Sequence, residues 1–168
     1  RCFVIGNGPS LRISDLERLN NEITFASNKT YLVFDKTHWR PTYYSAEDRC
    51  LAQVDWDVLN SLTGFTKLFP DYLDHFVPRF NDAIYYRLRW EELWKREFNY
   101  PEPPRFSTNA LDCVYAGCTI SYPLIQLAWF MGIREIYLIG MDFNYVVPEN
   151  TRSEKGGAFI SDGRESNH

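Results

Sequence analysis

The feature that most constrains the fold is the start of the chain, where a short apolar run breaks into a turn with two glycines. Residues 2–5 read Cys-Phe-Val-Ile, the composition of a strand buried on both faces by helices. Gly6 and Gly8 follow, and without Cβ atoms they let backbone amides approach a ligand. Pro9 fixes one φ angle, and Ser10 can cap a helix. This pattern predicts the first strand of an α/β domain, with a ligand loop at its end.

Loop 6–10 has the features of an anion site. Backbone amides and the dipole at a helix start would suit a phosphate or diphosphate. The spacing is not GxGxxG, and the lysine of a P-loop is missing, so neither standard dinucleotide binding nor Walker-type binding is matched. A plain strand–turn–helix junction without a ligand is the alternative interpretation.

Segments with strand and helix patterns alternate along most of the chain. The predicted strands are residues 2–5, 23–26, 42–46, 65–69, 84–88 and 135–140. The predicted helices are residues 11–19, 49–62, 90–98 and a buried helix over 121–131, with a short helix or turn over 30–34. The alternation predicts an α/β fold: a Rossmann-like, open, mostly parallel sheet with helices on both faces.

The region 71–106 is less regular and is rich in Tyr, Trp, Arg and Pro. We interpret it as an aromatic-rich insertion on the sheet, either a lid or an ordinary packed excursion. Near the other end, Ser121 is expected to cap the helix over 121–131, and Pro123 falls in its tolerated first turn.

Size and charge restrict the class of protein. The 168 residues suit a single domain, and 17% aromatic residues exclude a disordered chain. A net charge of −4 argues against broad binding to nucleic acid or to an anionic membrane. No apolar run has the 18 or more residues that a membrane span needs, so no transmembrane segment is predicted. The chain starts without Met and stops abruptly, so we expect it to be a fragment of a longer chain.

The four cysteines match neither a zinc site nor a redox motif, because no CxxC pair is present. We expect Cys2, Cys50, Cys113 and Cys118 to be reduced and mostly buried thiols, with Cys2 and Cys113 in apolar surroundings typical of core cysteine. With no signal peptide in view, the pattern favours the cytoplasm, including the inner face of the membrane.

Polar residues follow most of the predicted strands. In an open parallel sheet, the carboxyl ends of the strands meet at one edge, which we call the carboxyl edge. The candidates there are Asn7, Gly8, Ser10, Asn28, Lys29, Glu47, Asp48, Asp142, Asn144 and Tyr145. Thr119 and Ser121 would add phosphate donors at a helix start. Amide donors, side-chain amides and carboxylates together predict a nucleotide-type ligand.

The carboxylates and histidines have alternative roles. Glu47, Asp48 and Asp142 could ligate Mg²⁺ through a diphosphate, cap helices or bind ribose. His168, in a polar context after a flexible stretch, is either a general base or an exposed terminal residue. His38 and His75 lie beside aromatic residues and are expected to be structural.

Four segments carry a resemblance to a known family: GNGPSL (6–11), FASNKTY (25–31), PTYYSAED (41–48) and GIREIYLIGMDF (132–143). Together they resemble the MptE-like domain family, which includes archaeal 6-hydroxymethylpterin diphosphokinases and the core of Maf-type flagellin glycosyltransferases. The chain is also similar to bacterial sialyltransferases that use CMP-sialic acid. The resemblance covers most of the chain except roughly 70–105.

The sialyltransferase resemblance implies roles for particular residues. Asn7, Gly8 and Ser10 would contact a cytidine nucleotide, within a binding loop that also includes Gly6 and Pro9. Asn28, with Lys29 beside it, would hold nucleotide or sugar, and residues 119–121 would lie by the phosphate. Tyr145 would stabilise the departing phosphate, and His168 would deprotonate the acceptor.

The chain also departs from those enzymes. Gly117 or Cys118 stands where they carry an arginine, Lys29 replaces a glutamine, and the pair Glu47-Asp48 replaces a different turn. These departures bear on the donor sugar more than on the fold.

Three functions follow as predictions. The first is a glycosyltransferase with a CMP-sugar type donor and a glycan, glycolipid or protein acceptor, for bacterial surface glycan or flagellin modification. The second is a 6-hydroxymethylpterin diphosphokinase that uses ATP and Mg²⁺, which the acidic residues at 47, 48 and 142 would suit. The third is a nucleotide-binding module without turnover. We favour the glycosyltransferase, because the aromatic middle section suits a larger acceptor.

Overall fold

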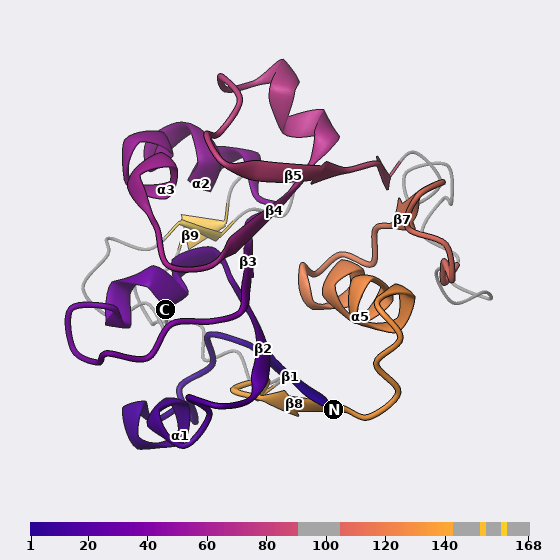
Figure 1. The fold of residues 1–168 in the computed structure, drawn as a ribbon. Coiled ribbons are helices and arrows are strands. Elements are labelled where there is room, and N and C mark those ends of the chain that lie inside the picture. Colours follow the sequence, from indigo (N-terminus) through magenta and orange to yellow (C-terminus); the bar gives the residue numbers. More distant parts are fainter. Residues whose placement is uncertain (91–104, 143–151, 154–158, 161–168) are drawn as a thin grey trace.

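A computed structural model describes residues 1–90, 105–142, 152–153 and 159–160 (Figure 1). Several predictions therefore lie outside the described residues: Tyr145, His168, Asn144, most of the helix over 90–98 and most of the stretch after residue 146.

A sheet of six strands forms the centre of the molecule (Figure 1). In spatial order the strands are β5 (Ala83–Tyr86), β4 (Thr66–Pro70), β3 (Tyr43–Ser45), β2 (Ile23–Ser27), β1 (Cys2–Ile5) and β8 (Ile136–Ile139). Every adjacent pair is parallel. Two small sheets accompany it: β6 (Leu88–Arg89) with β7 (Val114–Tyr115), and β9 (Arg152–Ser153) with β10 (Phe159–Ile160).

Helices cover both faces of the main sheet, as the alternating pattern predicts (Figure 1). One face carries α1 (Ile13–Glu17), α2 (Arg49–Val54) and α3 (Trp56–Ser61), and the other carries α5 (Ser121–Phe130). Two 3₁₀ helices, η1 (Asn28–Val33) and η2 (Asp71–His75), follow β2 and β4. The fold is the predicted open, Rossmann-like α/β fold.

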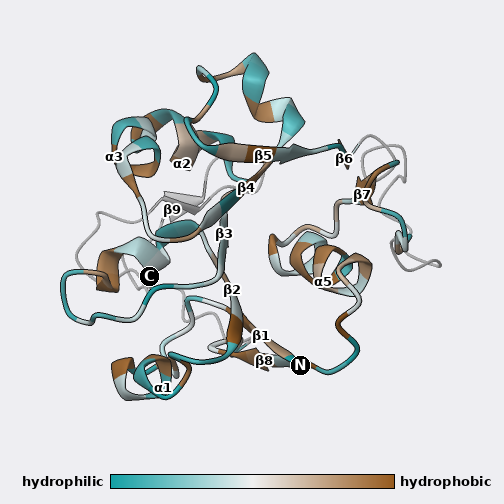
Figure 2. Ribbon diagram, in the orientation of Figure 1, coloured by the Kyte–Doolittle hydropathy of each residue, from teal (hydrophilic) through white to brown (hydrophobic). Residues whose placement is uncertain are grey.

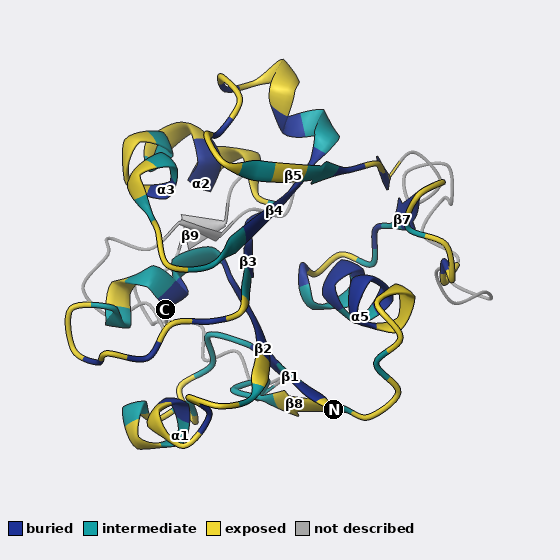
Figure 3. Ribbon diagram, viewed as in Figure 1, coloured by how far each residue is buried: buried dark blue, intermediate teal, exposed yellow. Residues whose placement is uncertain are grey.

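Two hydrophobic cores lie on opposite faces of the sheet because side chains alternate along each strand. Val4 packs in the core under α5, and its neighbour Ile5 packs in the core under α1, α2 and α3. Leu68 and Phe69 divide between the two cores in the same way. Apolar and buried residues accordingly concentrate in the central strands (Figures 2 and 3). The inner strands therefore contribute core residues to both faces, which explains the apolar runs in the sequence.

The helix predicted over 49–62 is in fact two helices, α2 and α3. Asp55 separates them with φ −109° and ψ 23°, which leave the helical region. Its carboxylate accepts a hydrogen bond of 2.6 Å from the Tyr31 hydroxyl on η1. The amphipathic spacing continues across the break, so the pattern alone does not reveal it.

Helix α5 differs from its prediction at both ends. Its N-cap is Ile120, without a side-chain cap, so Ser121 is the first helical residue and not the cap. In its last turn, Trp129 is 36% exposed and Phe130 is 39% exposed, so the helix is not buried throughout. In its middle, the fully buried Gln126 accepts hydrogen bonds from the amides of Ser107 and Tyr115. A polar residue thus ties α5 to β7.

Part of the predicted insertion completes the main sheet. The predicted strand over 84–88 splits, because β5 ends at Tyr86 and Leu88 begins β6, which pairs with β7. An aromatic cluster is present here: Phe69 stacks on Phe80 with ring centroids 4.2 Å apart. The lid stays a prediction, because residues 91–104 lie outside the described part.

The cysteines are buried at the two positions with apolar surroundings, but the expectation that the thiols are mostly buried is wrong for the other two. Cys2 and Cys113 are buried, whereas Cys50 and Cys118 are exposed, and all are free thiols. Burial raises the pKa of Cys2 to about 11, so this thiol is unreactive. Among the described helices, none has both the length and the apolar character to cross a membrane.

Candidate functional site

The carboxyl edge brings together residues that are far apart in the sequence. Strand β1 has β2 on one side and β8 on the other, so the strand order reverses at β1. Open α/β sheets bind ligands at such a switch point, outside the carboxyl ends of the strands. Helix α5 leads into the start of β8, so its own N-terminus lies toward this edge. The edge has two halves, at β1–β8 and at β2–β3.

At β1–β8, the loop donors are already bonded within the protein. The Ser10 amide donates to Asp142 Oδ2 over 2.8 Å, and the Ser10 hydroxyl donates to Asp142 Oδ1. The Gly8 amide donates to the Gly140 carbonyl over 2.8 Å. The bonds from Ser10 lower the pKa of Asp142. Groups expected to face a phosphate therefore hold the end of β8 instead.

The two loop glycines permit close packing of these strand ends. A Cβ at Gly8 would lie 2.6 Å from Asp142 Oδ2 and 2.7 Å from the Gly140 carbonyl oxygen. A Cβ at Gly6 would overlap that same oxygen. Gly140 itself has φ +64°, in the left-handed region that favours glycine. Because Gly6 and Gly8 have no side chains, residues 140–142 can pack directly against loop 6–10.

Asn7 and Ser10 also have structural roles that the sequence did not indicate. Asn7 Nδ2 donates to the Ser27 carbonyl over 2.9 Å, and Asn7 Oδ1 accepts from the Thr30 hydroxyl over 2.7 Å. Ser10 does not cap a helix, because the N-cap of α1 is Arg12. Pro9 is exposed at the tip of the loop.

At β2–β3, by contrast, a side-chain oxygen is enclosed without a partner. Asn28 follows β2 directly and has φ 49°, a strained value for a residue other than glycine. Its backbone carbonyl accepts from the Tyr44 hydroxyl. Its side-chain Oδ1 is buried, and no described residue offers it a hydrogen-bond donor.

Glu47 presents a second such oxygen, just beyond the end of the adjacent strand β3. Its Oε2 is buried without a hydrogen-bond partner in the described part of the chain, while its backbone carbonyl accepts from the Tyr72 hydroxyl. Burial, and then the neighbouring Asp48 charge, raise the pKa of Glu47 to about 7. Parallel strands lie about 4.8 Å apart, so the Asn28 and Glu47 backbones are near neighbours.

The three candidate carboxylates do not form a common ligand set. Asp48 caps α2 by accepting from the Cys50 and Leu51 amides, and Asp142 accepts from Ser10. Strands β3 and β8 are separated by β2 and β1, which places their ends about 14 Å apart. Within the described residues, no three His, Cys, Asp or Glu side chains are arranged to hold a metal ion.

The remaining predicted residues lie around this edge. Lys29 is half-buried in the first turn of η1, directly after Asn28. Thr119 is exposed at the start of α5, and its hydroxyl lies 3.4 Å from that of Ser121. The histidines His38 and His75 are exposed, so the expectation that they pack as structural residues is wrong.

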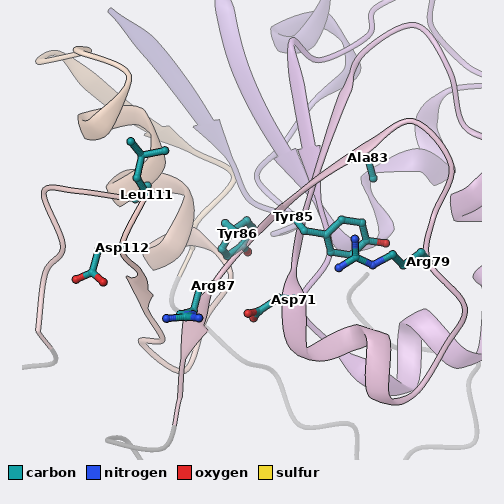
Figure 4. Close-up of a pocket in the computed structure, with 9 residues that line it drawn as sticks. Asp71, Arg79, Ala83, Tyr85, Tyr86, Arg87, Leu111 and Asp112 are labelled. Carbon is teal, nitrogen blue, oxygen red and sulfur yellow. The ribbon is translucent and has the colours of Figure 1, made fainter.

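A cavity of about 630 Å³ lies beside the edge strand β5 (Figure 4). Asp71, Tyr86 and Arg87 line its part nearest the carboxyl edge, since they lie at or just after the ends of β4 and β5. The turn around Leu111 and Asp112 forms another wall. The volume is within the range of small-molecule sites.

The tyrosines near Glu47 are not among the residues that the sequence predicts for the site. Tyr72 reaches the Glu47 backbone, and the Tyr86 hydroxyl lies 3.5 Å from Ser45 Oγ in β3. Burial and the nearby Glu47 charge raise the pKa of both phenols. Both tyrosines follow or end strands, which was the available signal, but they lie in the segment interpreted as an insertion.

Comparison with known proteins identifies no relative. No protein-family model, no curated protein and no solved structure matches this chain.

Proposed function

We propose that this chain is a glycosyltransferase that binds a nucleotide-activated sugar, of the CMP-sugar type, at the carboxyl edge of its sheet. The proposal rests on two buried side-chain oxygens, Asn28 Oδ1 and Glu47 Oε2. The described residues supply no hydrogen-bond donor to either of them. A buried acceptor without a donor costs about 1–3 kcal/mol. A ligand that offers O–H or N–H groups would recover that cost, and ribose hydroxyls and the cytosine amino group are such donors.

The use of the carboxylates favours glycosyl transfer over diphosphoryl transfer. Asp48 and Asp142 have partners within the protein, and only Glu47 of the three has an enclosed oxygen without one. Diphosphoryl transfer from ATP relies on Mg²⁺ held by carboxylates near the phosphates. Glycosyl transfer to a hydroxyl needs one proton acceptor and a departing phosphate, which this edge suits better. The acceptor would be a glycan, glycolipid or protein.

A nucleotide panel tests this proposal by thermal unfolding with CMP, UDP, or ATP with Mg²⁺. CMP at 100 times its Kd is expected to add about 2.7 kcal/mol to the free energy of unfolding. Stabilisation by ATP with Mg²⁺ but not by CMP would instead favour the diphosphokinase. If no nucleotide stabilises the protein, the proposal is wrong.

A further inference from the structure

Building on the proposed function, we propose that Glu47 is the general base of the transfer reaction and takes the proton from the acceptor hydroxyl. The sequence pointed to this residue only as a contact to nucleotide or metal. In the structure it has the placement and surroundings of a group that exchanges a proton with a substrate.

Glu47 has a central position at the carboxyl edge. It follows β3, so it lies between Asn28 at the end of β2 and Asp71 at the end of β4. The donor site is proposed on the Asn28 side, and on the other side Asp71 and Tyr86, which line the cavity, follow β4 and end β5. A base between a donor site and an acceptor cavity can reach the hydroxyl that joins them.

The described residues give Glu47 no partner that would hold it in one charge state. Among them, none donates a hydrogen bond to the buried Oε2, yet the residue as a whole keeps some exposure. The Tyr72 hydroxyl is engaged by the Glu47 backbone carbonyl, not by the carboxylate. A structural carboxylate is normally hydrogen-bonded or paired with a cation, and the described residues give Glu47 neither.

The electrostatic surroundings of Glu47 are uncharged or acidic. Among the described residues, the titratable groups that influence it, or are influenced by it, are Asp48 beside it, Tyr72 from η2 and Tyr86 from β5. None of these is a cation. Together with burial, they give the carboxyl a pKa of about 7, so near neutral pH it readily both accepts and releases a proton.

The step balances as a single displacement. The acceptor oxygen loses its proton to Glu47 and forms a bond to the anomeric carbon of the donor. The bond from that carbon to the phosphate oxygen breaks, and the phosphate leaves with the electron pair as the nucleoside monophosphate. Glu47 then releases its proton to water. Asn28, which does not titrate, is expected to orient the donor and not to take part in proton transfer.

The test uses Glu47→Gln, which keeps shape but cannot accept a proton, with Glu17→Gln on exposed α1 as the matched control. The probe is CMP-N-acetylneuraminate with water as the acceptor, and CMP release is measured from pH 5 to pH 9. For the unmodified protein and the control, kcat should rise with pH to a plateau, with an apparent pKa near 7. Glu47→Gln should lower kcat by about 100-fold or more and flatten the profile.

CMP affinity, measured by calorimetry, separates the two proposals. Glu47→Gln keeps one side-chain oxygen that can accept a hydrogen bond from the ligand, so it should raise the Kd for CMP by at most about tenfold, far less than the fall in kcat, whereas Glu47→Asp should retain a pH-dependent kcat. If Glu47→Gln keeps the normal kcat and pH profile, Glu47 is not the base, and the proposed function stands. If CMP fails to bind the unmodified protein, the proposed function is wrong and the role of Glu47 with it.

Discussion

The two halves of the carboxyl edge use their polar groups in opposite ways. At β1–β8, Ser10 and Asp142 bond to each other, and the glycines bring their strand ends into contact. At β2–β3, one side-chain oxygen each of Asn28 and Glu47 is buried, and the described residues give neither a hydrogen-bond donor. The loop that looks most like a ligand site is therefore closed by the protein itself, and the less distinctive strand ends hold the unsatisfied groups. A polar residue at a strand end becomes a candidate for binding when its partners are missing.

The largest effect is expected from Gly6→Ala, which tests whether the β1–β8 half is a packing contact. The added Cβ would overlap the Gly140 carbonyl oxygen, and a backbone atom cannot move aside easily. We expect a loss of about 3 kcal/mol in the free energy of unfolding, measured with urea.

Gly132→Ala is the matched control, because a Cβ there meets nothing within 4 Å and only its φ of +87° is unfavourable. It should cost about 1 kcal/mol. Equal losses in the two variants would show that β1 and β8 are not tightly packed.

The next largest effect is the pH dependence of stability that Glu47, in the β2–β3 half, is expected to cause. The folded-state pKa of Glu47 is about 7, above its ordinary value of 4.5. Between these values the folded protein binds more protons than the unfolded chain, so stability falls as pH rises. From pH 5 to pH 7 the free energy of unfolding should fall by about 2 kcal/mol through this residue.

Glu47→Gln should remove most of that slope in urea titrations at the two pH values. The Glu17→Gln control should keep it. If the pH dependence of the free energy of unfolding is unchanged in Glu47→Gln, the Glu47 carboxyl of the unmodified protein is ionised and has a partner. The two halves of the carboxyl edge would then not differ.

A smaller effect is expected from Asn28→Gly, which should weaken ligand binding while leaving the free energy of unfolding almost unchanged. Glycine adopts φ 49° without strain, so Asn28→Gly should change the free energy of unfolding by less than about 0.5 kcal/mol. The same variant removes the unpartnered Oδ1 and should weaken CMP binding about tenfold, as loss of one hydrogen bond would. Unchanged affinity would place the nucleotide elsewhere.

Ser10→Ala should have the smallest effect. It removes the hydroxyl bond to Asp142 but keeps the Ser10 amide bond, on an exposed surface. We expect Tm at pH 7 to fall by about 2 °C. The pKa of Asp142 is lowered below its ordinary 3.8, so the bond stabilises the fold above that range and is lost as the carboxylate protonates. The difference in Tm should therefore shrink at strongly acidic pH, as calorimetric scans can check.

The sheet was predictable because its signals are local. Apolar runs such as Cys2–Ile5 and Ile136–Ile139, each followed by a glycine turn, identify strands of the sheet, although only the inner strand Cys2–Ile5 is largely buried. The helix break at Asp55 was not predictable, since the apolar spacing continues through it and the hydroxyl it binds lies on η1. The surroundings of Glu47 were missed for a similar reason, because Tyr72 comes from η2 and Tyr86 from β5, both distant from Glu47 in the sequence.

The fold class and the set of polar residues at the carboxyl edge follow from local patterns, because strand periodicity and turn residues act over a few neighbouring positions. Which of those residues have partners depends on the folded chain. Ser10 and Asp142 are 132 positions apart, yet they satisfy each other, while Glu47 is enclosed by segments that leave its carboxylate without a donor. Hydrogen-bond satisfaction and burial depend on the packing of distant segments, so they exist only once the chain has folded.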